Sequence, residues 1–279
     1  MQRRPIFLIS MLCFGFAFFY IPILSMIVYS FNGSRLATVW GGFSLKWYVS
    51  LFNNRQVGEA LWLSIRIALI SATMSTILGT MAGIALVRFK KFRGRTLFTG
   101  MVTAPLVMPD VITGISSLML FILMAEYLGW PGQRGFTTIT LAHITFSMVY
   151  VTTIIQSRLG QADLAIEEAA MDLGSKPAQV LWDITLPVIF PAILSGWLLA
   201  FTISLDDVVI TSFTTGPGNT TLPLLIWSKV KLGVTPDINA LATLIVLVVG
   251  IGVVVAGIVL NRATKRAAAD ERLAYRAND

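Results

Sequence analysis

Long apolar runs separated by short polar segments dominate the chain. A helix needs about 20 mostly apolar residues to cross the hydrocarbon core, because each residue advances about 1.5 Å through a layer about 30 Å thick. Six runs reach this length, over residues 6–31, 60–87, 97–125, 136–156, 188–213 and 240–260. The pattern predicts an all-α polytopic membrane protein with six transmembrane helices, forming a single transmembrane domain over residues 1–279.

Lysine and arginine are distributed unevenly between these runs. If the N-terminus is cytoplasmic, the inner segments hold 14 of these residues and the outer segments hold 6. Cytoplasmic loops of membrane proteins are enriched in Lys and Arg, so we expect both termini in the cytoplasm. The run 88–95 alone carries five basic residues, which is typical of an anchor at anionic lipid head groups. Several tryptophans then fall near the outer interface, as in an aromatic belt.

Composition excludes several classes of protein. Of the 279 residues, 56% are apolar and 13% are charged, and the mean hydropathy is +0.78. An average globular chain is roughly a quarter charged, so a disordered polymer and almost every soluble enzyme are excluded. One Cys and one His give no basis for a disulfide framework or a zinc site, and we expect no metal site. Basic cytoplasmic loops explain the net charge of +7, so we expect no nucleic-acid partner.

The longest inner connection, residues 157–187, is too polar to cross the membrane. Asp163 suits a helix N-cap, helix-forming residues follow it, and Gly174 stands where a C-terminal cap belongs. These signals predict a short helix along the membrane surface, although a solvated amphipathic loop is the alternative. Pro177 predicts the start of a second helix, which we expect to end within residues 184–187. Four acids form one edge of the first helix: Asp163, Glu167, Glu168 and Asp172.

The same loop carries a sequence signature. Glu168-Ala169-Ala170, three residues, Gly174, nine residues and then residues 184–187 follow the pattern E-A-A-x3-G-x9-I-x-L-P. The chain resembles the bacterial ABC importer permeases, whose EAA loop has this pattern at every defined position. The resemblance implies a type I ABC importer permease fold with a cytoplasmic coupling helix that docks into a groove of an ATPase subunit. It assigns the docking to Glu168, Ala169, Ala170 and Gly174.

A wider resemblance runs along nearly the whole chain. Residues 103–114 and 204–223 are similar to the permeases of spermidine and putrescine importers, with the putrescine type the nearer. This implies a multi-pass protein of the bacterial inner membrane whose partners are a second homologous permease chain, two ATPase subunits and a periplasmic or extracellular polyamine-binding protein. The chain has no G-x-x-x-x-G-K-[ST] sequence. We therefore expect a non-catalytic subunit without a cofactor of its own, with ATP and Mg²⁺ bound by the partner ATPase.

Carboxylates within the predicted spans point to a path for cations. Asp110 lies about 20 Å along the third predicted span and Asp206 about 22 Å along the fifth, at about 1.5 Å per residue. An intramembrane charge is costly unless it meets a partner or water. Acids gathered at one level of the membrane attract a cation. Asp110, Asp206 and Asp207 therefore predict a site for the ammonium groups of a polyamine. Predicted walls for its methylene chain are Trp197, Phe201 and Tyr150.

Several of these residues also have a structural interpretation. Asp206 could cap a helix or bond a neighbouring backbone, while Asp207, the next residue, points about 100° away. Arg66 is close enough to the outer surface to extend its side chain to water, or it could pair with one of the acids. A structural role is favoured for Arg66, and an interior hydrogen-bonded role for the lone His143.

Other functions stay open at the level of the sequence. The importer could carry another small cationic solute, a metal complex or an amino acid. A stand-alone secondary transporter or channel is a different class, but such transporters usually contain inverted repeats, and the chain has no convincing internal repeat. An intramembrane enzyme is disfavoured because no nucleophile and base pair is evident with one His and one Cys.

Overall fold

The computed structural model describes residues 6–35, 39–89, 91–233 and 235–251. These residues are helical apart from turns and loops, and one isolated antiparallel bridge joins Asn32 to Phe43. They divide into two compact units. Unit 2 spans Gln56–Ser228, and unit 1 contains the described residues before and after it. The single domain over residues 1–279 stays a prediction.

The helices of the described residues are joined by turns and loops. In chain order they are α1 (Ile6–Ser30), α2 (Lys46–Phe52), α3 (Arg55–Arg88), α4 (Arg95–Val107), α5 (Asp110–Leu128), α6 (Phe136–Gln161), α7 (Leu164–Asp172), α8 (Pro177–Val180), the π-helical segment η1 (Leu181–Thr185), α9 (Leu186–Asp206), α10 (Val209–Thr214) and α11 (Leu222–Leu232). An apolar helix, Pro236–Ile251, follows them. The predicted all-α class is confirmed.

Five helical stretches are long and apolar enough to cross a membrane within the part of the chain described: Phe7–Ser30, Arg55–Arg88, Asp110–Leu128, Phe136–Gln161 and Pro177–Asp206. The first, second and fourth predicted spans correspond to α1, α3 and α6. The sixth, 240–260, overlaps the shorter apolar helix Pro236–Ile251, which is not one of the five stretches, so the sixth span stays a prediction. Residues 252–260, Arg3, Arg4 and the basic C-terminal tail lie outside the described residues.

The third predicted span, 97–125, is wrong as a continuous helix. α4 ends at Val107 and α5 begins at Asp110. Between them Met108 has φ −78° and ψ 135°, an extended conformation. The ring of Pro109 disfavours a helical conformation at the residue before it, which explains the position of the break.

The fifth predicted span, 188–213, and the helix predicted to end at residues 184–187 both differ from the structure. The helix that begins at Pro177 continues through η1 into α9 and ends only at Asp206. In η1 the Leu186 N–H bonds to Leu181 O, five residues back. The backbone hydrogen bonds thus change from the α-helical to the π-helical spacing directly before Pro187, which has no N–H. This change lets the helix continue through the proline. A second break follows at Asp207, before α10.

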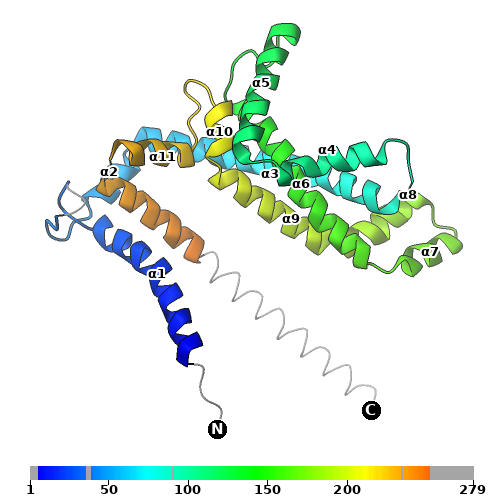
Figure 1. Cartoon of the computed structure of the whole chain (residues 1–279), viewed down its shortest axis with the longest axis horizontal. Helices are drawn as coiled ribbons and strands as arrows, with labels where there is room; N and C mark the ends of the chain where they lie inside the picture. Colours follow the sequence, from blue (N-terminus) through cyan, green and yellow to red (C-terminus); the bar gives the residue numbers. More distant parts are fainter. Residues whose placement is uncertain (1–5, 36–38, 90, 234, 252–279) are drawn as a thin grey trace. The chain divides into compact units, whose positions relative to one another are not determined.

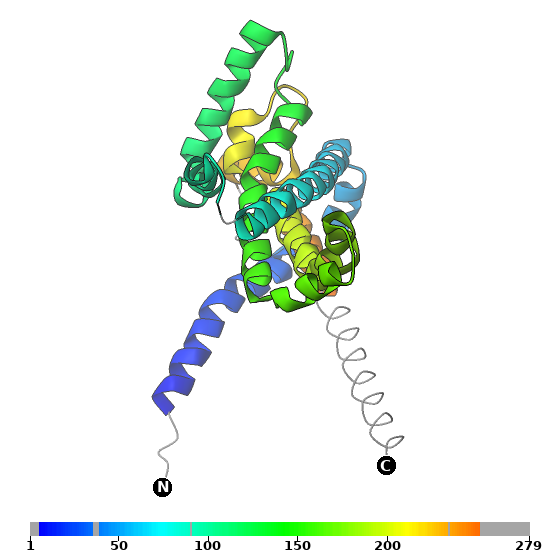
Figure 2. The same ribbon diagram turned by 90° about the vertical axis from the view of Figure 1, so that its right-hand side faces the viewer.

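Two buried clusters hold unit 2 together. The first joins α3, α6 and α9 and the second joins α5, α6 and α10. The first comprises Ala72, Val151, Ile155, Leu159, Ile189, Ala192 and Ala200, and the second Phe121, Ala142, Phe146 and Ile210. Helices α6 and α9 lie side by side in both views (Figure 1 and Figure 2). Close packing of these side chains supplies the van der Waals contacts that hold the helices of the unit together.

Helices α3 and α6 approach closely because two glycines face α6. A Cβ at Gly79 would lie 2.8 Å from Met148 O, and a Cβ at Gly83 would lie 2.7 Å from Cγ2 of Ile155. Small residues at helix crossings bring backbones together, which compensates for the weak hydrophobic drive between helices in lipid. The contact fixes α3 against the helix that carries His143.

Candidate functional site

The predicted surface helix is present as α7, with both predicted caps. Oδ1 of Asp163 accepts a hydrogen bond from the Ala165 N–H at 2.9 Å, so its side chain caps the N-terminus. Gly174 has φ +93°, a conformation that favours glycine. The N–H groups of Gly174 and the next residue bond to carbonyls in the last turn of α7, which forms a Schellman motif. Both predicted ends of this helix are confirmed.

Most of the residues assigned to docking are exposed. Glu168, Ala169 and Gly174 are exposed and Ala170 is half-buried. Figure 1 shows α7 at one end of unit 2, beyond the end of α6 and next to α8. This position leaves the three exposed residues accessible to another protein. Docking of an ATPase on them stays a prediction.

Glu167 has contacts that the sequence analysis missed. Oε1 of its carboxylate accepts hydrogen bonds from Nη2 of Arg88 at 2.5 Å and from Oγ1 of Thr185 at 2.9 Å. Arg88 is the last residue of α3 and Thr185 the last of η1. The sequence places Arg88 in the basic run expected at the lipid head groups and Glu167 on the acidic edge of the surface helix. No spacing in the sequence relates these three residues, so the contact is found only in the tertiary structure.

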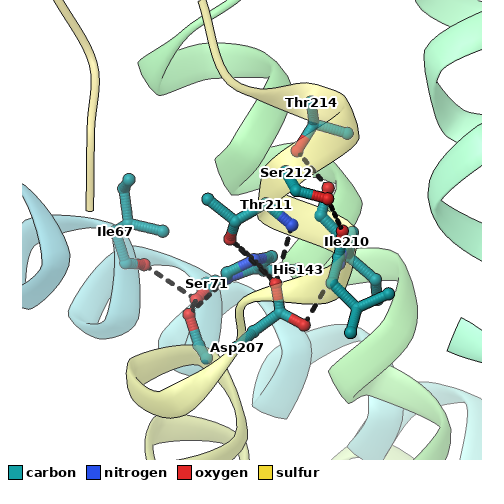
Figure 3. A network of polar contacts seen from close by, with 10 residues as sticks. Ile67, Ser71, His143, Asp207, Ile210, Thr211, Ser212 and Thr214 are labelled. Atoms are coloured by element: carbon teal, nitrogen blue, oxygen red, sulfur yellow. Dashed lines mark hydrogen bonds and ion pairs between the residues drawn. The ribbon is translucent and has the colours of Figure 1, made fainter. Parts of the chain in front are cut away.

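A buried polar network lies at the break between α9 and α10 (Figure 3). Oδ2 of Asp207 accepts from the Thr211 N–H at 2.7 Å and from Thr211 Oγ1 at 2.8 Å. Oδ1 accepts from the Ile210 N–H at 3.3 Å. The carboxylate therefore satisfies free N–H groups at the start of α10, as an N-cap does. The capping role considered for Asp206 belongs to Asp207.

His143 links this carboxylate to α3 and α9. Its ring is 2% exposed. Nδ1 lies 2.7 Å from Ser204 Oγ, and Nε2 lies 3.3 Å from Asp207 Oδ2 and 3.0 Å from Thr211 Oγ1. Ser204 Oγ lies 2.8 Å from Ser71 Oγ on α3. The predicted interior role of His143 is confirmed, and its network ties α3, α6, α9 and α10 at one level.

The other two predicted acids, Asp110 and Asp206, are exposed. Asp206 is the last residue of α9, and Asp110 is the first residue of α5. Each acid thus lies beside a helix break. Helices α5 and α10 lie side by side in both views, and a Cβ at Gly114 of α5 would lie 2.6 Å from the Phe213 ring of α10. The two broken helices pack against each other, but contact of these acids with a substrate stays a prediction.

The aromatic residues predicted to line the path lie in two separate places. Trp197 and Phe201 stack on α9 with ring centroids 5.4 Å apart and an interplanar angle of 10°. Trp197 Nε1 also donates to Thr73 Oγ1 at 3.2 Å. Tyr150 instead packs at a steep angle against Phe146, with centroids 5.4 Å apart, beside the second buried cluster. Arg66, for which a structural role was favoured, is exposed and lies over the Phe136 ring, 5.1 Å from its centroid.

Two hollows in unit 2 lie away from Asp110, Asp206 and Asp207. A small, partly open pocket of about 30 Å³ lies between α6, α7, η1 and α9, beside Arg88 and Glu167. An open groove of about 620 Å³ lies between α6 and α9 and is lined by polar residues that include Ser157, Arg158 and Gln161. None of the predicted substrate-path residues lines either hollow. Within the described ranges, no cluster of three or more His, Cys, Asp or Glu side chains could hold a metal ion.

Comparison with known families identifies the class of protein. Residues 75–269 match the family described as binding-protein-dependent transport system inner membrane component. The chain belongs to this family. It is thus a component of a transport system of the inner membrane, as the resemblance implied. A stand-alone secondary transporter is not favoured, because transport in this family depends on a binding protein.

Individual relatives cover nearly the whole of this permease. It is 54% identical over 268 residues to the putrescine transport system permease protein PotI of Escherichia coli K12, which covers 96% of this chain and 95% of that protein. It is 44% identical to the spermidine/putrescine transport system permease protein PotC of Haemophilus influenzae, over 88% of this chain and 93% of that protein.

Solved structures share the fold of this permease. One chain of a bacterial ABC transporter involved in alginate import aligns with a TM-score of 0.68 at 17% identity, covering 92% of this chain and 97% of that chain. One chain of the MetNI methionine ABC transporter in an inward-facing form aligns with a TM-score of 0.61 at 12% identity, covering 79% of this chain and 99% of that chain. The permease therefore has the fold of ABC importer permeases.

Proposed function

We propose that this permease forms half of the path through which an ATP-driven importer moves polyamines, putrescine or spermidine, into the cell. The observation that carries the proposal is the 54% identity, over 96% of the chain, to a protein named as a putrescine transport permease. A second relative, at 44% identity, is named for spermidine and putrescine transport. Both names point to the same class of solute, a small linear polyamine.

The chemistry of the helix breaks agrees with a cationic solute. Asp110 and Asp206 are exposed carboxylates at helix ends. A desolvated ammonium group needs a carboxylate or a similar partner. Trp197 and Phe201, stacked on α9 before Asp206, offer aromatic faces to the methylene groups and ammonium groups of a polyamine. In this proposal Asp207 contributes to the path by holding the helix break in place. Tyr150 contributes from its position beside the second buried cluster.

The complete transporter in this proposal contains several chains. Two permease chains, this one and a homologous sister, enclose the path, and two ATPase subunits hydrolyse ATP in the cytoplasm. Each permease has six spans with both termini cytoplasmic. The coupling loop meets an ATPase through Glu168, Ala169, Ala170 and Gly174, and a polyamine-binding protein delivers solute on the outer face. The exposed surface of α7 supports this assignment.

Uptake by the complete complex tests the proposal. The four kinds of subunit are reconstituted in lipid vesicles, and entry of labelled putrescine is measured with excess unlabelled putrescine, spermidine, lysine or methionine as competitor. We expect saturable uptake that the two polyamines reduce and the amino acids do not. Uptake of another solute class, with no saturable entry of either polyamine, would remove the polyamine assignment.

A further inference from the structure

Three elements of unit 2 meet at one carboxylate oxygen. Glu167 on α7 accepts hydrogen bonds at Oε1 from Arg88 at the end of α3 and from Thr185 at the end of η1, at 2.5 Å and 2.9 Å. The Arg88 and Glu167 side chains are 17% and 16% exposed. Partial burial strengthens a charge-assisted hydrogen bond, because less water competes for it. We call these three residues the Glu167 contact.

Helix α7 contacts α8 and η1 but contributes no fully buried side chain. It has nine residues. Isolated helices shorter than about 12–15 residues are marginal in water, and without a buried side chain apolar packing contributes little. The Glu167 contact is therefore a principal attachment of α7 to the bundle. The pocket beside it, about 30 Å³, is too small for a polyamine, so it offers no solute site.

The two consecutive glutamates of α7 differ in environment. Glu167 lies against α3 and η1, whereas Glu168 is exposed. Consecutive residues on a helix point about 100° apart, so one carboxylate serves contacts within the chain while the other is free for a second protein. The helix thus presents separate acids to its own bundle and to a partner.

The third residue of the contact lies at an unusual point of the backbone. Thr185 ends the π-helical segment that leads into α9, and its Oγ1 also lies 3.3 Å from Val180 O. Single π-turns within helices occur frequently at functional sites. A displacement of Glu167 therefore acts on the segment where the hydrogen-bond pattern of the α8–α9 helix changes.

We propose that Glu167, through Arg88 and Thr185, is a positioning residue that transmits movement of α7 to α3 and α9. The proposal rests on the proposed function, in which α7 is moved by an ATPase. Helix α9 ends at Asp206 and α3 carries Ser71 of the buried network. Movement of α7 therefore reaches α9, which ends at the Asp207 break, and α3, which is tied to that break through the buried network. Loss of the contact leaves α7 able to bind the ATPase but less able to move the bundle.

The test compares transport and hydrolysis in the complete complex. Glu167→Ala removes the whole contact, Thr185→Val removes one hydroxyl without changing size, and Thr185→Ser keeps the hydroxyl. Matched controls are Asp183→Asn, an exposed acid on η1, and Arg93→Gln, an exposed basic residue in the run that contains Arg88. For each variant we measure assembled complex, ATP hydrolysis, and putrescine moved per ATP hydrolysed.

We expect Glu167→Ala, which removes both hydrogen bonds, to lower putrescine moved per ATP at least about tenfold, because one charge-assisted hydrogen bond alone corresponds to about that factor. Thr185→Val lowers it by a smaller factor, Thr185→Ser restores it, and both controls match the wild type. A purely structural role would reduce the amount of complex and leave the ratio unchanged. The proposal is overturned if assembled Glu167→Ala and Thr185→Val keep the wild-type ratio, or if they only lower the yield of complex. Absence of ATP-driven uptake in the wild type would instead contradict the proposed function.

Discussion

Asp206 and Asp207 are neighbours in the chain with opposite environments. The Asp207 carboxylate accepts hydrogen bonds from the Ile210 and Thr211 N–H groups and from the Thr211 hydroxyl, whereas Asp206 is exposed. The break between α9 and α10 therefore uses one acid to hold its own backbone. The other acid is left at the surface of the described chain, where a solute or a second chain can reach it.

Replacing the two acids by alanine is expected to have unequal effects on stability. Asp207→Ala leaves the first N–H groups of α10 and the Thr211 hydroxyl without their acceptor, which costs about 1–3 kcal/mol for a buried polar group. Asp206→Ala breaks no such contact and is expected to change the free energy of unfolding by less than about 0.5 kcal/mol. Thermal unfolding of the purified permease in detergent measures both. Equal losses in the two variants would show that Asp207 does not hold the break.

Neutralising the exposed acids is expected to reduce transport without reducing assembly. Asp110→Asn and Asp206→Asn each remove one negative charge from the helix breaks, and we expect each to lower putrescine uptake about tenfold, as for loss of one charge-assisted contact. Glu126→Gln, an exposed acid near the other end of α5, serves as the matched control. If both aspartate variants transport as well as the wild type, these acids do not meet the solute.

The glycine at the α3–α6 crossing is expected to resist substitution. A Cβ at Gly79 would lie 2.8 Å from both the Met148 carbonyl oxygen and Cβ of Val151, neither of which can move freely. We expect Gly79→Ala to destabilise unit 2 by about 1–3 kcal/mol through overpacking. Gly58→Ala, on the same helix with open space around it, is expected to be neutral or slightly stabilising, because alanine favours helix. Similar unfolding temperatures for the two variants would contradict this packing.

Acid is expected to weaken one ion pair in unit 1. Burial of Asp237 opposes its ionisation, but hydrogen bonds from Thr235 and Lys229 outweigh burial and hold the pKa of this carboxyl below its ordinary value. Because the folded pKa is the lower one, the stabilisation is present above the unfolded pKa of about 3.9 and is lost as the pH falls through the folded pKa. The pair is partly exposed, so the loss is at most about 1 kcal/mol.

Unfolding temperatures at about pH 6 and about pH 3, on either side of the ordinary Asp pKa, measure this contribution. Asp237→Asn and Lys229→Gln each remove the pair, and both variants are expected to show a smaller difference between the two pH values than the wild type. An unchanged pH dependence in both variants would show that the pair contributes nothing to stability.

Local signals in the sequence were sufficient for the surface helix. The caps at Asp163 and Gly174 depend on contacts within a few residues, so the pattern predicts them directly. The apolar runs likewise predict α1, α3 and α6, because the membrane fixes the length of a span. Hydropathy does not detect the breaks at Met108 and Asp207, since the runs stay apolar across them. Pro109 is the local signal for the first break.

The contacts that define the candidate site are long-range. Glu167 meets residues 79 positions before it and 18 after it, and His143 meets Asp207 across 64 positions. Such pairs follow from how helices pack, which a single sequence does not specify. The family signature predicts a role for Glu168, the exposed glutamate. The contact within the chain is instead made by its neighbour Glu167.

ATP-driven uptake tests the central claim most directly. The complete complex is reconstituted in vesicles with labelled putrescine, with and without ATP, and carries either the wild-type chain or Glu168→Lys, whose insertion is verified separately. We predict uptake by the wild type only when ATP is present, and none by Glu168→Lys. Equal flux with and without ATP, or normal uptake by Glu168→Lys, would contradict a path operated by an ATPase acting on the coupling loop.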